Sequence, residues 1–118
     1  MHLIPGLGNI VFKNLLNKFE TPEQVFQASL SALMTVEGIR QTVARKIVSR
    51  ECSADPEDVL KRIEKQKARI LLHSDPDYPL GLRQIHDPPM VLYLKGKEIP
   101  HNLNLIAIVG SRNPTPYG

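Results

Sequence analysis

The sequence predicts an α+β chain, in which a helical first half is followed by the opening strands of an α/β sheet. Three observations lead to this prediction. Apolar residues recur at helical spacing up to about Arg50, and a turn-and-helix pattern occurs twice in that region. After Lys67, short apolar runs alternate with turn residues. We place the boundary near residues 52–55, without a long linker.

The repeated pattern is the most specific feature of the first half. Gly6 and Gly38 lie 32 residues apart, and the apolar stripes behind them keep that separation. The stripes are Val11, Phe12, Leu15 and Leu16 in the first copy, and Val43, Ala44, Ile47 and Val48 in the second. Each copy reads apolar-x-Gly-apolar and then a helix, which is typical of a helix-hairpin-helix unit used twice.

Start signals predict the remaining helices. Thr21 can cap a helix that has Pro22 at its first position, and another helix follows through residues 30–34. Asp55 and Pro56 open a further helix, whose apolar side carries Val59, Leu60 and Ile63.

The second half predicts three short strands, at residues 70–72, 91–94 and 106–109. Residues 75–79 form a turn, and residues 80–85 form one or two helical turns. The first of these strands, 70–72, is expected to be buried. Short apolar strands separated by helical pieces favour a mainly parallel sheet that is buried on both faces in the complete domain. Only one side of that domain is expected in this chain, which leaves one face of the sheet uncovered.

Composition restricts the class of protein. Of 118 residues 42% are hydrophobic and 23% charged, which excludes a disordered chain. No apolar run is long enough to span a bilayer and no signal peptide is present, so we expect no membrane association. Cys52, the single cysteine, cannot form an internal disulfide, which favours the cytoplasm. The net charge of +3 permits a polyanionic partner without requiring one.

The hairpin glycines are candidate nucleic-acid contacts. Gly6 and Gly8 allow backbone N–H groups to approach a phosphate oxygen at the start of the next helix, with Lys13 behind them. The second copy keeps Gly38 but has Arg40 where the first has Gly8. The alternative interpretation is that both are packing turns of a small helical bundle.

Gly110, Ser111 and Arg112 form the most chemically suggestive segment. They follow the predicted strand 106–109, at the end of a strand where open α/β sheets bind ligands. The serine and the backbone can donate to a phosphate, and the arginine can form a bidentate contact. The alternative is an ordinary turn with a solvated arginine.

The other polar residues indicate no catalytic, cofactor or metal site. The four histidines lack metal-ligand spacing, and turn capping explains Asp75, Asp77 and Asp87. For Tyr78 and Tyr93 a core or interface role is favoured over stacking on bases.

Four motifs in order resemble the amino-terminal part of the bacterial DNA processing protein A family, DprA, also called Smf. They are IPGLGN (4–9), DPDYP (75–79), IHDPPMVLYLKG (85–96) and IAIVGSRNPTPYG (106–118). The resemblance implies a helical domain of helix-hairpin-helix or sterile-alpha-motif type over 1–54. It also implies the start of an extended Rossmann-like domain over 55–118.

The resemblance also implies a function. Members are cytoplasmic, non-enzymatic single-stranded DNA-binding proteins of natural transformation (competence), which protect incoming DNA and help load the RecA recombinase. Gly110, Ser111 and Arg112 would line the DNA pocket. The chain looks like a fragment, with the rest of the Rossmann-like domain, the homodimer surface and any winged helix expected beyond Gly118.

Two alternatives remain. Rossmann-like nucleotide phosphoribohydrolases also open with a strand that leads into Gly-Ser, so the chain can instead belong to an enzyme that binds a nucleoside monophosphate. The helical half can also be a protein-interaction module without DNA contact.

Overall fold

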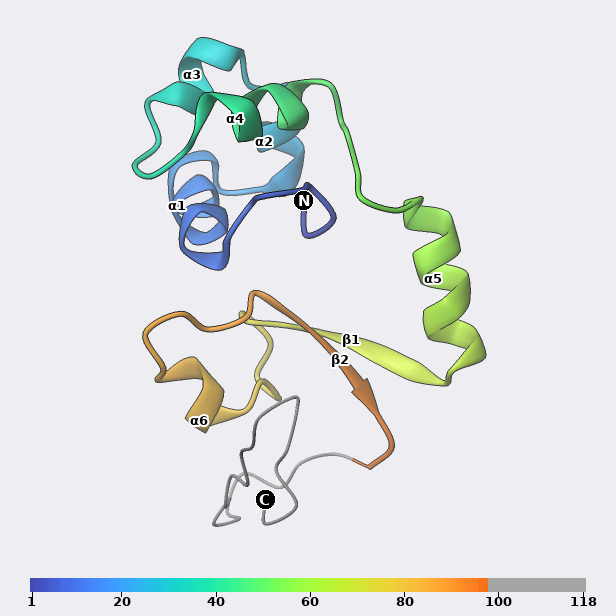
Figure 1. The fold of residues 1–118 in the computed structure, drawn as a ribbon. Helices are drawn as coiled ribbons and strands as arrows, with labels where there is room; N and C mark the ends of the chain where they lie inside the picture. The colour runs from blue at the N-terminus through green and yellow to red at the C-terminus, as the bar shows by residue number, and fades with distance from the viewer. Residues whose placement is uncertain (98–118) are drawn as a thin grey trace, which may run out of the picture.

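The architecture is that of a computed structural model, which describes residues 1–97. Its elements in chain order are α1 (Asn9–Phe19), α2 (Pro22–Gln27), α3 (Leu30–Met34), α4 (Gln41–Val48), α5 (Pro56–Lys65), β1 (Ala68–Leu72), α6 (Leu80–Arg83) and β2 (Val91–Lys95). Figure 1 shows α1 to α4 as one helical group, α5 along one side, and the strands with α6 below. The predicted α+β class is confirmed for these residues. The strand predicted over 106–109 lies outside them.

Side-chain caps set where several helices begin. The Thr21 hydroxyl accepts a hydrogen bond from the backbone N–H of Gln24 (3.3 Å), and Pro22 occupies the first turn of α2. Asp55 caps α5 in the same way, accepting from the Glu57 N–H at 2.9 Å. Both starts agree with the sequence prediction, because a capping oxygen satisfies an N–H that has no partner within the helix.

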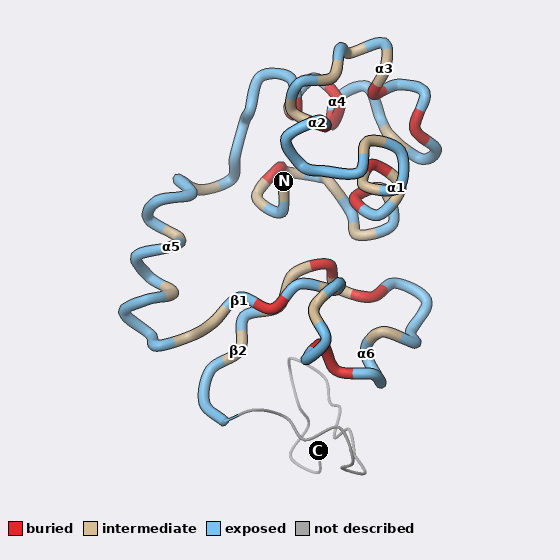
Figure 2. The backbone as a smooth tube through the Cα atoms, turned by 180° about the vertical axis from the view of Figure 1, so that it is seen from behind, coloured by how far each residue is buried: buried red, intermediate tan, exposed pale blue. Residues whose placement is uncertain are grey.

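The core of the helical group draws on all four helices. Leu15, Val25, Leu33, Ala44 and Ile47 are fully enclosed, and they pack in one cluster with Ile4, Val36 and Val43. Figure 2 shows buried segments on α1, α3 and α4. Each enclosed Leu, Val or Ile contributes about 1.5–3 kcal/mol of burial energy, so the helical group is held together mainly by these contacts.

The two predicted copies have matching backbone geometry. Helices α1 and α4 begin 32 residues apart, at Asn9 and Gln41. Backbone hydrogen bonds recur at the same separation: Leu7 N–H to Ile4 O (3.2 Å) with Ile39 N–H to Val36 O (3.3 Å), and Phe12 N–H to Gly8 O (2.9 Å) with Ala44 N–H to Arg40 O (3.0 Å). The repeat in the sequence is therefore a repeat in the structure.

The two copies also pack on each other reciprocally. A Cβ atom added to Gly6 would lie 3.5 Å from Cγ2 of Val43, and one added to Gly38 would lie 3.4 Å from Cγ2 of Val11. Val11 and Val43 are equivalent positions of the repeat. The glycine of each copy therefore faces the valine of the other copy. Such reciprocal contacts are expected when two units are related by an approximate two-fold axis.

The two strands form an antiparallel ribbon, so the prediction of a mainly parallel sheet is wrong for this pair. The register runs from Ala68 opposite Lys95 to Leu72 opposite Val91. A parallel pair needs a crossover, usually through a substantial helix. Here residues 73–90 contain only the four-residue α6, and the His73 N–H donates to the Met90 carbonyl (3.0 Å), so the chain folds straight back.

Burial of the strands also differs from the prediction. Leu71 is buried, whereas Ile70 and Leu72 are 40% and 44% exposed. Side chains of a strand alternate between its two faces, and only one face of the ribbon is covered among the described residues. The exposure of Ile70 and Leu72 differs from the buried strand predicted over 70–72, whereas the uncovered face agrees with the expectation for this sheet.

The helical group touches the ribbon through a small number of groups. The Asn9 side-chain carbonyl lies 3.5 Å from the backbone N–H of Met90, and the His2 ring packs edgewise on Tyr93. The Ser53 N–H donates to the Leu3 carbonyl (2.8 Å), which fastens the first residues to the segment before α5. The first hairpin (residues 4–8, equivalent to residues 36–40 of the second hairpin) thus lies between the helical group and the ribbon.

Replacing Gly38 by Ser should lower the free energy of unfolding by about 1–2 kcal/mol, because its φ of +80° is a left-handed conformation that side chains resist. Urea denaturation followed by circular dichroism measures this. The matched control is Gly8→Ser. Gly8 has an extended φ of −76° and no atom within 4 Å of an added Cβ, and serine is a good N-cap residue. Equal losses for the two variants would contradict the role assigned to the positive φ at Gly38.

Candidate nucleic-acid interface

The first hairpin presents an open helix N-terminus. Gly6 has a φ of +85°, which reverses the chain, and Gly8 occupies the N-cap of α1 without a side chain to cover it. The first N–H groups of a helix lack partners within the helix and carry partial positive charge. No acidic residue lies in the first turn of α1. The geometry therefore suits an anion at this turn.

The second hairpin has the same backbone and different side chains. Gly38 keeps the positive φ, and Arg40, which is exposed, stands at the N-cap of α4. The Asn14 side-chain amide donates to the Glu37 carbonyl (3.2 Å). A hollow of about 260 Å³ lies beside this turn, lined in part by Asn14 and Glu37. The carboxylate of Glu37 beside this turn makes it less favourable to an anion than the first turn.

The lysines of α1 do not gather at the first hairpin. Lys18 reaches the second hairpin, where its ammonium group donates to the Thr35 hydroxyl. Lys13 lies close enough to His73, in the loop between the strands, for its charge to lower the pKa of that imidazole. Residues five apart on a helix point in different directions, and so these two cations serve different parts of the molecule.

The loop between β1 and β2 is organised around Tyr78. This ring is fully buried, and its hydroxyl donates to the Pro89 carbonyl (2.8 Å). His73 packs against it with ring centroids 5.1 Å apart, and the Arg83 guanidinium lies 5.5 Å from the ring centroid. Arg83 also donates to the Asp75 carbonyl (2.7 Å). The favoured core role of Tyr78 is confirmed.

Two groups in this cluster have shifted pKa values. Burial lowers the pKa of His73, and the charges of Arg83 and Lys13 lower it further, so the imidazole is neutral at pH 7. Burial raises the pKa of the Tyr78 hydroxyl, with Arg83 acting in the opposite direction. Two nitrogens of the cluster, His73 Nε2 and Arg83 Nε, are enclosed without a hydrogen-bond partner. Asp75 caps its turn as predicted, accepting from the Leu72 N–H at 2.7 Å.

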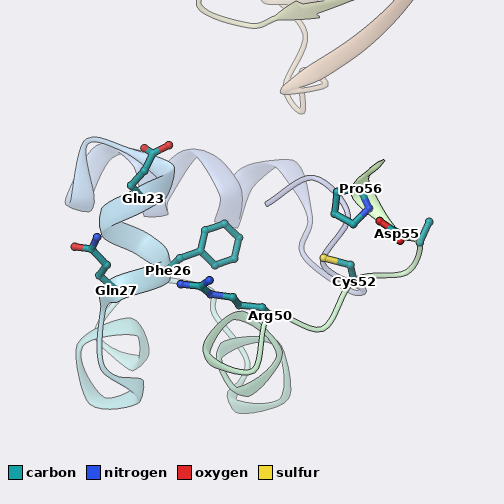
Figure 3. A pocket seen from close by; sticks show the side chains of 8 residues that line it. Glu23, Phe26, Gln27, Arg50, Cys52, Asp55 and Pro56 are labelled. Carbon is teal, nitrogen blue, oxygen red and sulfur yellow. The ribbon is translucent and has the colours of Figure 1, made fainter. Parts of the chain in front are cut away.

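A separate groove lies at the other end of α4, beyond its last turn. It has a volume of about 540 Å³ and lies between α2 and the segment that leads into α5 (Figure 3). Its lining is Glu23, Phe26, Gln27, Arg50, Cys52, Ala54, Asp55 and Pro56. The Arg50 guanidinium lies 6.0 Å from the centroid of the Phe26 ring. The groove is mostly apolar, with two carboxylates in its lining.

The segment Gly110, Ser111 and Arg112 lies outside the described residues, so its assignment stays a prediction. Within residues 1–97, no group of three or more His, Cys, Asp or Glu side chains is placed to hold a metal ion. None of the helices described here is long and apolar enough to cross a bilayer.

Comparison with known proteins shows which proteins the chain resembles. Residues 69–118 match the family model described as DNA recombination-mediator protein A. The chain is 33% identical to protein Smf of Synechocystis sp. over 119 aligned residues, which cover 98% of the chain and 30% of that protein. It is 41% identical over 61 residues to the DNA processing protein DprA of Bacillus subtilis, covering 51% of the chain and 20% of that protein.

A third match is with a DNA ligase of Fervidobacterium nodosum, at 31% identity over 62 residues, which are 52% of the chain and 9% of the ligase. No solved structure gives a significant match. The chain belongs to the DprA/Smf family and spans about a third or less of the length of the family members named above.

The cluster around Tyr78 was not predicted as a unit from the sequence. The sequence predicts the turn over residues 75–79 from its prolines and aspartates. This pattern is local and does not indicate that His73 or Arg83 packs against Tyr78. One signal in the sequence does point to the cluster, namely an aromatic residue within a proline-rich turn. Ordering such a turn costs conformational entropy, and burial of the aromatic ring can offset that cost.

Stability should fall as the pH is lowered through about 6.5, because the unfolded chain then binds a proton at His73 more readily than the folded one. The contribution is fully present above the unfolded pKa and is lost between that value and the lower folded pKa. His73→Gln should flatten this pH dependence, as measured by urea denaturation at pH 7.5, 6.5 and 5.5. His86→Gln, at an exposed histidine, serves as the control. An unchanged pH profile in His73→Gln would refute the assignment.

Proposed function

We propose that the chain is part of a single-stranded DNA-binding protein of natural transformation and recombination, which protects incoming DNA and helps to load the RecA recombinase. The single observation that carries the proposal is the pair of hairpins packed reciprocally, each ending at a helix N-terminus free of acidic residues. A helix N-terminus of this kind attracts phosphate groups in any nucleotide sequence.

Family membership supports the same function. The matching family model is described as a recombination mediator, and the relatives from Synechocystis and Bacillus subtilis are named as Smf and as a DNA-processing protein. The DNA ligase relative adds a second kind of protein whose substrate is DNA. The matched residues 69–118 contain Gly110, Ser111 and Arg112, which we propose as further phosphate contacts.

The proposal includes the organisation of the protein. Residues 1–54 form a helical domain of helix-hairpin-helix or sterile-alpha-motif type, and residues 55–118 begin a Rossmann-like domain. We further propose a cytoplasmic, non-enzymatic protein that forms homodimers. Binding through backbone amides, arginine and lysine needs neither a cofactor nor a catalytic residue.

The apolar groove favours a second candidate function. A groove of about 540 Å³ with Phe26 on one side and Pro56 on the other is large enough to seat side chains of another protein. Under this alternative the helical group is a protein-interaction module, and the hairpins contact no DNA. Chemical-shift changes at the hairpins on addition of short single-stranded DNA would decide against it.

The DNA contacts can be tested with fluorescence anisotropy of a labelled 20-nucleotide oligothymidine at several salt concentrations. Arg40→Gln and Arg112→Ala should each weaken binding and reduce the slope of log K against log salt by about 0.7, the value for one lost phosphate contact on a single strand. The effect should be the same for other nucleotide sequences.

The matched control is Lys61→Gln, which removes an exposed cation of α5 whose partner is Asp58. Unaltered affinity and salt slope in Arg40→Gln would remove the second hairpin from the interface. The same result for Arg112→Ala would remove the predicted pocket.

A further inference from the structure

The antiparallel ribbon has one face with an unusual surface. Alternation along the strands places Ile70 and Leu72 of β1 on the same face as Tyr93 and Lys95 of β2, and Ile70 pairs directly with Tyr93. The three apolar side chains are 40%, 44% and 47% exposed, respectively. Adjacent exposed apolar side chains of this size mark an interaction surface more often than a solvated one.

The exposed Tyr93 ring lies beside the first hairpin. His2 packs on it edgewise, with ring centroids 5.8 Å apart and an interplanar angle of 61°. Just before β2, the Met90 N–H lies 3.5 Å from the Asn9 side chain at the start of α1. Both ends of the segment that contains Gly6 and Gly8 are therefore anchored on the chain around β2.

Charge on the ribbon has a single sign. Residues 66–72 and 91–97, which are the strands and their flanks, contain four cations and no acidic residue. The cations are Lys67, Arg69, Lys95 and Lys97. The Lys95 ammonium donates to the side-chain carbonyl of Gln66 (2.7 Å), a neutral partner that positions the charge without cancelling it. Lys95 is also on the Tyr93 face.

We infer that this face is a binding site for single-stranded DNA, with Tyr93 and Lys95 as its main contacts. A base stacks on the exposed Tyr93 ring next to His2, and Lys95 contacts the adjoining phosphate. Aromatic rings combined with positively charged side chains are the usual components of sequence-tolerant single-strand binding. An apolar protein partner would use the same apolar side chains but would gain nothing from the charge of Lys95 on this face.

The inference rests on the proposed function, since it assumes that the chain binds single-stranded DNA. It adds a contact that the hairpins and the segment 110–112 do not supply, namely one with the bases. Phosphate contacts are made equally with any backbone, whereas stacking requires a base to be present.

Comparing strands with and without bases therefore tests the stacking contact. The 118-residue chain is titrated into a labelled 20-nucleotide oligothymidine and into an abasic oligonucleotide of equal length and charge. The wild type should bind oligothymidine about tenfold more tightly than the abasic strand. Tyr93→Leu, which keeps an apolar side chain, should bind both equally, and Tyr93→Phe, which keeps the ring, should retain the preference. Lys95→Gln should weaken binding to both and reduce the salt slope by about 0.7.

A second measurement avoids reliance on the variants. In NMR spectra of the wild type, the Tyr93 ring resonances should shift upfield on addition of oligothymidine and stay in place with the abasic strand. If Tyr93→Leu keeps the preference for bases, or if the ring resonances do not move, the stacking site is wrong. Loss of self-association in Tyr93→Leu, seen by light scattering, would instead identify the face as a protein interface. Failure of the wild type to bind either strand would refute the proposed function itself.

Discussion

The reciprocal contact between the hairpin glycines and the valines of the opposite copy is the constraint on which the helical group depends. Each turn reverses at a positive φ and brings its backbone against Val43 or Val11. A side chain at Gly6 or Gly38 would strain the turn, because both positions have a positive φ that L-residues resist. Because each copy supplies the surface on which the other packs, neither turn-and-helix unit can keep its geometry alone, and the buried cluster is shared between them.

The two turn-and-helix copies of the helical group share a backbone geometry but differ in the side chains on their surfaces. Equivalent positions hold Pro5 and Glu37, or Gly8 and Arg40, while the hydrogen bonds of the two turns stay the same. The first turn is left open to backbone contact with an anion, and the second offers a cation beside a carboxylate. One repeated backbone therefore carries two turns with different surface chemistry, because the turn geometry depends on the glycines and the surface on the side chains around them.

The seam between the helical group and the ribbon brings together residues far apart in the chain. His2 meets Tyr93, Asn9 approaches Met90, and Lys13 acts electrostatically on His73. These contacts are few and polar or edge-on, unlike the apolar cluster above them. Tyr78 is buried within the loop between β1 and β2 and gives this loop a small core of its own. The helical group and the ribbon are therefore stabilised by separate cores and joined by directional contacts.

The sequence by itself determined the helices, their caps and the repeat, since these depend on residues within a few positions of each other. Thr21 and Asp55 cap their helices as expected, and Gly6 and Gly38 form turns with a positive φ. Only the tertiary structure decided the strand direction, the exposure of Ile70 and Leu72, and which groups Lys13 and Lys18 approach. An apolar run does not encode which strand lies beside it or whether a second layer covers it, and a surface lysine does not encode its neighbour, because both depend on chain segments that are distant in sequence.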